Sequence, residues 1–128
     1  MASIELIKKH RHYSGWVCFY KHQSEATKTE MKFSVFTPDL NEGERLKTLF
    51  WLSGLTCTEE NFITKSNFGR SASEERMVIV CPDTSPRGAN LPGEDDSYDF
   101  ASGAGFYLNA TEAPWNRNYR MSVSYTHL

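Results

Sequence analysis

Apolar and polar residues alternate in the first third of the chain, and later segments are almost continuously apolar. Residues 16–20 form a short β-prone stretch, and residues 31–36 alternate apolar and polar side chains. Alternation of this kind indicates a strand with one buried face. Residues 38–44 are polar and turn-forming. The pattern therefore predicts that the fold begins with half-buried strands.

Two later runs, residues 48–52 and 77–81, are nearly all apolar. Such runs are typical of strands that are buried on both faces, as in parallel sheets. The segment between them has helical signs, because Thr58 precedes two acidic residues, and Ser71 and Ser73 precede two more. Strand, helix and strand in this order predict a crossover unit. We therefore expect an α/β fold with antiparallel first strands and then a parallel βαβ crossover.

The segment from Asp83 to Gly105 is rich in Gly, Pro, Ser, Asp and Asn. A loop of this length inside a compact domain is usually functional or disordered. Four aromatic residues lie within or beside it: Tyr98, Phe100, Phe106 and Tyr107. We therefore expect an ordered loop that packs on the body of the domain.

Length, composition and charge narrow the class of protein. The chain has 128 residues, of which 39% are apolar and 13% aromatic, enough for the core of one domain. A net charge of −2 argues against a nucleic-acid partner, which favours a basic face. No apolar run approaches the length of a membrane span, so we expect no membrane partner.

The cysteines and the N-terminus indicate a cytoplasmic protein. The first nine residues lack the basic and apolar segments of a secretory signal. Cys18, Cys57 and Cys81 are widely spaced and form no Cys-x-x-Cys pair, which argues against a zinc or dithiol site. Free thiols are typical of the cytosol. Cys18 and Cys81 fall in apolar runs and are expected in the core.

Residues 52–58, with the sequence LSGLTCT, join an apolar run to a predicted helix start. A loop at such a junction can present backbone N–H groups to a substrate. Acyl transfer builds negative charge on a carbonyl oxygen, and fixed N–H groups stabilise that charge without reorganising. Gly54 would let the backbone approach a substrate closely. An ordinary strand–helix turn explains the same spacing, which by itself does not decide between the two.

Five blocks of sequence closely resemble S-formylglutathione hydrolase, the esterase D family of the α/β-hydrolase superfamily. These blocks occur in the family's order and are residues 52–62, 82–88, 93–100, 103–107 and 114–121. The resemblance covers about residues 1–121, and we therefore expect the N-terminal portion of a single α/β-hydrolase domain.

The resemblance implies a thioesterase that cleaves S-formylglutathione to glutathione and formate in formaldehyde detoxification, with a Ser–Asp–His triad and no cofactor or metal. It implies that the N–H of Leu55 is one oxyanion donor and that Gly54 and Cys57 lie near the active site. A related carboxylesterase or acyltransferase of the same fold, or a non-catalytic fragment, is the alternative. A homodimer of the full-length protein stays open.

This sequence departs from the family pattern because it contains no Gly-x-Ser-x-Gly nucleophile motif. The nearest match, residues 69–73, ends in Ser and opens a predicted helix. The resemblance places all three triad residues beyond Met121, so we expect the fragment to be inactive. Surface or structural roles are expected for the four histidines, His10, His12, His22 and His127.

Three further features have competing interpretations. Residues 122–128 resemble the translation of a sequencing adaptor, and a divergent helix start is the alternative. Arg87 could meet a substrate carboxylate or form a structural ion pair. The acidic residues 94–96 do not have the spacing of a calcium loop, so we expect them to be solvated or hydrogen-bonded within the loop.

Overall fold

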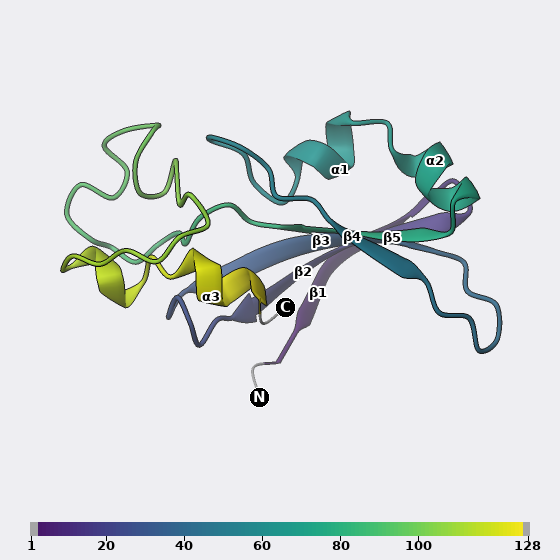
Figure 1. The fold of residues 1–128 in the computed structure, drawn as a ribbon, viewed down its shortest axis with the longest axis horizontal. Helices are drawn as coiled ribbons and strands as arrows, with labels where there is room; N and C mark the ends of the chain where they lie inside the picture. The colour runs from purple at the N-terminus through teal and green to yellow at the C-terminus, as the bar shows by residue number, and fades with distance from the viewer. Residues whose placement is uncertain (1–2, 127–128) are drawn as a thin grey trace.

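The computed structural model describes residues 3–126, which form a mixed five-stranded sheet with two short helices, residues 61–65 and 69–74, on one face (Figure 1). The strands, in spatial order, are β1 (Glu5–His12), β2 (Gly15–Gln23), β3 (Glu30–Pro38), β5 (Met77–Pro82) and β4 (Lys47–Phe50). The helical segments are α1 (Asn61–Lys65), α2 (Gly69–Glu74), the single 3-10 turn η1 (Trp115–Arg117) and α3 (Met121–Thr126).

The sheet changes from antiparallel to parallel across its width. Strands β1, β2 and β3 form an antiparallel meander, and β3 pairs antiparallel with β5. Strand β4 pairs parallel with β5 after a crossover through α1 and α2. The expected order of antiparallel first strands followed by a parallel crossover is confirmed.

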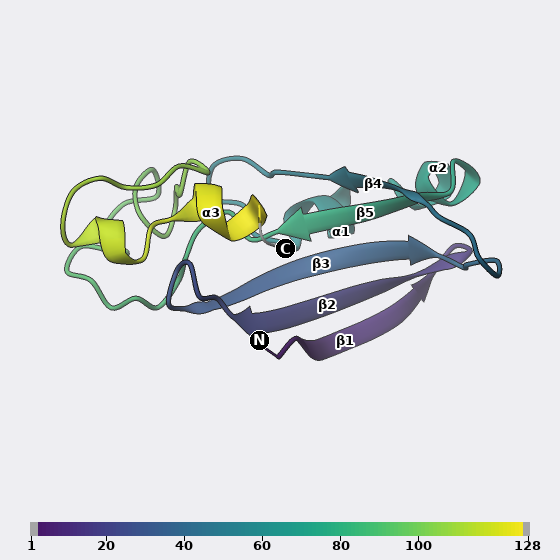
Figure 2. The same cartoon turned by 60° about the horizontal axis from the view of Figure 1, so that its bottom comes forward.

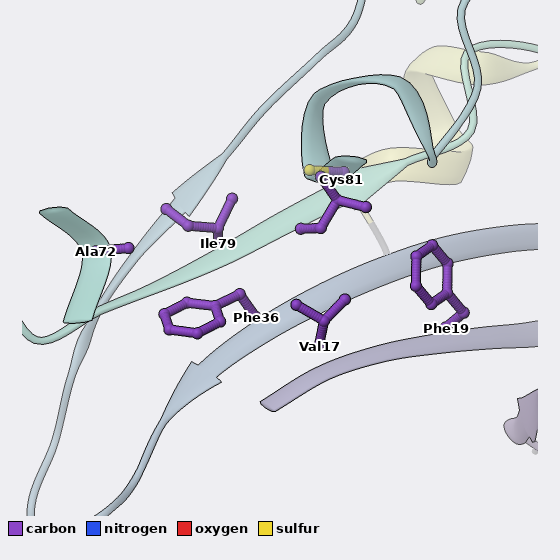
Figure 3. Close-up of a cluster of buried hydrophobic side chains, with 7 residues drawn as sticks. Val17, Phe19, Phe36, Ala72, Ile79 and Cys81 are labelled. Carbon is purple, nitrogen blue, oxygen red and sulfur yellow. The ribbon is translucent and has the colours of Figure 1, made fainter. Parts of the chain in front are cut away.

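The hydrophobic core lies between the sheet and the two crossover helices (Figures 1 and 3). Val17 of β2 pairs with Phe36 of β3, which pairs with Ile79 of β5, so their side chains share one face. Ile63 of α1 and Ala72 of α2 complete this core from the helical side. The apolar positions of the alternation in residues 31–36 do not face this core, because Met31 and Phe33 lie on the opposite face of β3 from Phe36.

Helix α2 approaches the end of β1 closely at Gly69. A Cβ atom there would lie 2.1 Å from Nε2 of His12 and 2.6 Å from Cδ2 of Tyr13. His12 is half-buried and its ring also packs tilted against Phe68, with ring centroids 5.4 Å apart. Only glycine fits this position without displacing the rings of His12 and Tyr13.

One prediction about the strands requires correction, and one strand was not identified from its own residues. The run 48–52 was expected to be buried on both faces, but β4 covers only Lys47–Phe50 and is exposed throughout. It is exposed because, within residues 3–126, no strand pairs with its outer side. Strand β1 had no sequence signal, since its residues are mostly polar and exposed.

The crossover helices are short, with α1 and α2 covering five and six residues. The predicted helix start at Thr58 is three residues too early, because α1 begins at Asn61 with Glu60 as its N-cap and has no acidic residue in its first turn. Thr58 lies in the preceding turn, where its Oγ1 accepts a hydrogen bond from the N–H of Glu60 at 3.2 Å. No helix within residues 3–126 has the length and apolar character that a bilayer crossing requires.

Residues 83–107, here called the long loop, extend from the end of β5 beyond the sheet (Figure 2). The expectation that its aromatic residues pack on the body is correct for Tyr107, which is half-buried. It is wrong for Tyr98, Phe100 and Phe106, which are exposed. Of the proposed tail, residues 122–126 belong to α3, and 127–128 lie outside the described residues.

Candidate active site

The residues Ser53–Cys57, here called the 53–57 loop, form a tight turn after β4. The N–H of Cys57 donates to the carbonyl oxygen of Gly54 at 3.2 Å, which closes a β-turn around Leu55 and Thr56. Thr56 has a φ of 62°, in the left-handed region that β-branched residues rarely adopt. Such a conformation persists only where surrounding structure holds it, and these sites concentrate at binding and catalytic centres.

The N–H of Leu55 is free in this turn. Among residues 3–126, it donates no hydrogen bond to a backbone carbonyl group. Leu55 itself is 49% exposed, and a Cβ added to the neighbouring Gly54 would meet no atom of the described chain within 4 Å. We expected this N–H to point into open space at the end of a central strand. The open surroundings fit, but the strand is an edge strand and ends five residues earlier, at Phe50.

A pocket of about 260 Å³ is lined in part by Leu55 and its neighbours Ser53 and Gly54. The 53–57 loop forms one wall and the long loop, with its glycine-rich segment, forms the other. The lining residues are Ser53, Gly54, Leu55, Thr84, Gly103, Ala104, Gly105, Phe106 and Tyr107.

Two glycines of the long loop allow the close packing behind this pocket. A Cβ on Gly103 would lie 2.1 Å from the carbonyl oxygen of Tyr98, and one on Gly105 would lie 2.5 Å from that of Thr84. Real Cβ atoms do not approach backbone so closely, so any larger residue would displace the loop.

Hydrogen bonds from the long loop hold the 53–57 loop. The phenol of Tyr107 donates to the carbonyl oxygen of Ser53 at 2.7 Å, and the N–H of Thr56 donates to that of Gly103 at 2.9 Å. The hydroxyl of Thr84 donates to the carbonyl oxygen of Cys57. Burial, with a smaller contribution from nearby anionic groups, raises the pKa of Tyr107 to about 12, so its phenol stays a donor at neutral pH.

Arg87 also reaches the 53–57 loop. Its guanidinium makes two 2.9 Å hydrogen bonds to the carboxylate of Asp83, and donates to the carbonyl oxygens of Ser102 at 2.9 Å and Cys57 at 3.3 Å. The hydrogen bond to Asp83 raises the pKa of Arg87. Of the two interpretations of Arg87, the structure shows the structural ion pair.

Neither the cysteines Cys57 and Cys81 nor the acidic residue Glu94 lines the pocket. Cys57 is half-buried two residues after Leu55, and its side chain is not part of the pocket lining. Burial raises the pKa of Cys81 to about 11, which keeps it an unreactive core thiol. Glu94 is buried and accepts hydrogen bonds from the Tyr119 phenol at 2.9 Å and from two backbone N–H groups. Within residues 3–126, no cluster of three metal-ligating side chains occurs.

The other candidate residues have structural positions. Residues 69–73 lie in α2, where Ser71 is an exposed helical residue, so no nucleophile turn forms there. His10 is exposed beside Phe19, and His22 is half-buried. Burial lowers the pKa of His22. His127 lies outside the described residues.

Sequence reasoning located the 53–57 loop but gave no role to Tyr107 or Thr84. The only signal was that both belong to blocks of the resemblance, 103–107 and 82–88. The bond from Tyr107 to Ser53 joins residues 54 positions apart, which local pattern does not reveal.

Comparisons with known proteins agree on the family. Residues 24–126 match the esterase family described as "Putative esterase". The chain is 50% identical over 119 residues to the S-formylglutathione hydrolase of Mus musculus, covering 93% of this chain and 42% of that protein.

Two solved structures are similar in fold. An S-formylglutathione hydrolase from Agrobacterium tumefaciens is 43% identical with a TM-score of 0.89, over 95% of this chain and 44% of that one. One from Staphylococcus aureus is 17% identical with a TM-score of 0.51, over 98% of this chain and 41% of that one, and supports the fold alone. The chain therefore spans about two fifths of the length of these relatives. It belongs to the esterase family and has the α/β-hydrolase-type fold of the S-formylglutathione hydrolases that it matches.

Proposed function

We propose that the full-length protein carrying this chain is a serine thioesterase that hydrolyses S-formylglutathione to glutathione and formate. The observation that carries the proposal is the free N–H of Leu55 beside a small pocket, in a chain similar to S-formylglutathione hydrolases. Leu55 supplies one oxyanion donor, and Gly54 gives the substrate carbonyl room to approach it.

The chemistry of a thioester suits this arrangement. A thiolate is a good leaving group because thiol pKa values lie near ~8.5, so most of the barrier lies in forming the tetrahedral intermediate. A fixed N–H that faces the developing oxyanion lowers that barrier without reorganising. A formyl group is the smallest acyl group, so the acyl pocket of the full-length protein should be tight.

The rest of the proposed machinery lies outside this chain. The nucleophilic serine, the acid, the histidine and the second oxyanion donor belong to the part of the full-length protein that follows. We propose that it needs no cofactor or metal, acts in the cytoplasm, has no nucleic-acid partner and can form a homodimer. Residues 122–128 would be foreign to it.

The test compares the full-length protein with residues 1–128 alone. Full-length protein should hydrolyse S-formylglutathione much faster than acetyl or longer acyl esters, and a serine-directed fluorophosphonate should label it. The isolated chain should give neither turnover above buffer nor labelling. Faster hydrolysis of longer acyl esters would replace the proposal with a carboxylesterase, and an unlabelled full-length protein would indicate a non-catalytic one.

We further propose that Cys57 lies at the edge of the active site. Its position two residues after Leu55 and its half-buried state support this placement. Alkylating the full-length protein with N-ethylmaleimide should lower thioester hydrolysis at least tenfold. A Cys57→Ala variant should keep most of its activity through the same treatment. Equal losses in both proteins would place the sensitive thiol elsewhere.

A further inference from the structure

We propose that Tyr107 and Arg87 are positioning residues that hold the 53–57 loop so that the N–H of Leu55 stays aimed into the pocket. This inference rests on the proposed function, because it concerns how the oxyanion donor is fixed. Neither side chain is assigned contact with the reacting atoms. Each acts through a backbone carbonyl group of the loop.

The contacts surround Leu55 on both sides along the chain. Tyr107 holds the carbonyl of Ser53, two residues before Leu55, with its 2.7 Å hydrogen bond. Arg87 and Thr84 both donate to the carbonyl of Cys57, two residues after it. Every one of these donors comes from the long loop, so that loop fixes both ends of the turn.

The turn requires such support because its backbone is strained. Thr56, directly after Leu55, has a φ of 62°, and a β-branched residue leaves this region when nothing opposes it. The hydrogen bond from the N–H of Thr56 to the carbonyl oxygen of Gly103 holds Thr56 in this conformation. Loss of a neighbouring contact would let the turn rotate, and with it the peptide group that carries the Leu55 N–H.

The Tyr107 side chain is itself held in a defined direction. Phe106 and Tyr107 are consecutive residues with φ values of 55° and 54°. This backbone turns back against the 53–57 loop. The hydroxyl stays protonated at neutral pH because burial raises the pKa of Tyr107 to about 12. The hydroxyl of Tyr107 therefore still donates its hydrogen bond to Ser53 at neutral pH.

Arg87 is anchored before it reaches the loop. The side chain of Asp83 is 5% exposed and takes two parallel hydrogen bonds from the guanidinium. The remaining N–H groups contact the carbonyls of Ser102 and Cys57, so one planar group ties two parts of the long loop to the 53–57 loop. Lysine presents a single ammonium and does not reproduce this geometry.

The first test uses Tyr107→Phe in the full-length protein, with Tyr119→Phe as the matched control. Both changes remove one phenol hydroxyl with a single hydrogen bond, and Tyr119 donates to Glu94 instead of the 53–57 loop. Displacing an oxyanion donor acts on the transition state, so kcat of Tyr107→Phe should fall about tenfold while KM changes less than twofold. Tyr119→Phe should keep kcat within twofold of the parent.

The second test repeats the comparison with Arg87→Lys, and uses Arg70→Lys as its control. Arg70 forms an exposed ion pair with Glu74 on α2, and among residues 3–126 it makes no side-chain hydrogen bond to the 53–57 loop. Arg87→Lys should lower kcat about tenfold at nearly constant KM, and Arg70→Lys should leave both unchanged. This pair decides the question if Tyr107→Phe does not fold, which its thermal unfolding curve would show.

Amide hydrogen exchange supplies a readout that does not depend on turnover. Peptides covering residues 53–57 should exchange at least tenfold faster in Tyr107→Phe and Arg87→Lys than in the parent and the two controls. If the parent hydrolysed no thioester or ester, the proposed function would fail, while exchange would still report whether the two residues hold the loop. Unchanged exchange, kcat within twofold of the parent, or equal losses in the controls would each overturn the inference.

Discussion

The two edges of the sheet differ in how they meet solvent. Strand β1 carries Lys8, Lys9 and Arg11 along its length, and its pairing with β2 is interrupted between Leu6 and Lys8. The charged side chains lie over aromatic rings of β2, for example Lys8 Nζ 4.1 Å from the Phe19 ring centroid. Charges and an irregular register are the devices by which proteins protect an edge from pairing with other chains.

Strand β4 has none of that protection along its apolar half. Leu49 and Phe50 are 42% and 46% exposed, and the chain continues through exposed Trp51 and Leu52. Such residues are typical of a strand that is paired and covered. The relatives are more than twice as long as this chain. We therefore expect a later strand of the full-length protein to pair with β4, whereas β1 is the finished edge.

The largest expected effect concerns self-association of residues 1–128 alone. We expect this chain to associate through β4, because an apolar unpaired edge is a pairing template. Phe50→Lys should raise the concentration at which it associates by about tenfold. Ile7→Lys on β1 is the control, since Ile7 and Phe50 are both 46% exposed. Sedimentation velocity measures the outcome, and equal effects of the two changes would remove the distinction between the edges.

A smaller effect is expected where β1 is anchored to the helical layer. Gly69→Ala places a Cβ against the His12 ring and should lower the free energy of unfolding by about 1–3 kcal/mol. Arg70→Ala, on the exposed side of the same helix, should cost about 0.5 kcal/mol or less. Urea unfolding of the full-length protein measures both. Similar costs would show that α2 does not anchor the β1 edge.

The connection into β4 should be sensitive to acid. Hydrogen bonds from Arg76 and Asn41 lower the pKa of Glu44 to about 2, from an ordinary 4.5. The unfolded carboxyl therefore binds protons first, so this stabilisation is present above about pH 4.5 and is lost as the pH falls toward about 2. Glu44→Gln should flatten the loss of stability across that window, and Arg76→Gln should do the same. Parallel pH profiles of parent and variants would contradict this.

The smallest effect belongs to the exposed contacts of β1. Lys9 Nζ lies 4.2 Å from the ring centroid of Trp16, and exposed contacts of this kind contribute about 0.5–1 kcal/mol. Lys9→Ala should lower the free energy of unfolding by about 0.5 kcal/mol. Lys9→Arg keeps a cation above the ring and should be close to neutral. Equal losses in both variants would attribute the effect to packing of the lysine stem.

Much of the sheet could be predicted from local pattern. The alternation in residues 31–36 predicted β3, and the apolar run 77–81 predicted β5, which is paired on both sides. Strand β1 escaped prediction because its charged residues become a strand only through pairing with β2. The exposure of β4 could not be predicted, because an apolar run indicates only the environment to which a strand is suited. Within residues 3–126, no strand pairs with the outer side of β4.

The candidate site, too, could be predicted only in part. The 53–57 loop could be predicted because a glycine between an apolar run and a helix start is a local signal, strengthened by the resemblance. The support from Tyr107 and Arg87 could not, since their bonds to the loop cross 54 and 30 positions. Contacts of that range depend on how the whole long loop folds back.

The register of the sheet also sets an order of assembly during synthesis. Arg11 pairs with Trp16, only five positions later, so the β1–β2 hairpin can form as soon as both strands have emerged from the ribosome. Phe33 of β3 pairs with Pro82, so the edge of β3 that faces β5 stays unpaired until β5 has been synthesised. Slow synthesis between completion of the β1–β2 hairpin and completion of β5 would lengthen the time for which a partly formed sheet is exposed. Codon choice across residues 39–82 is therefore expected to influence how much of the protein reaches its native fold.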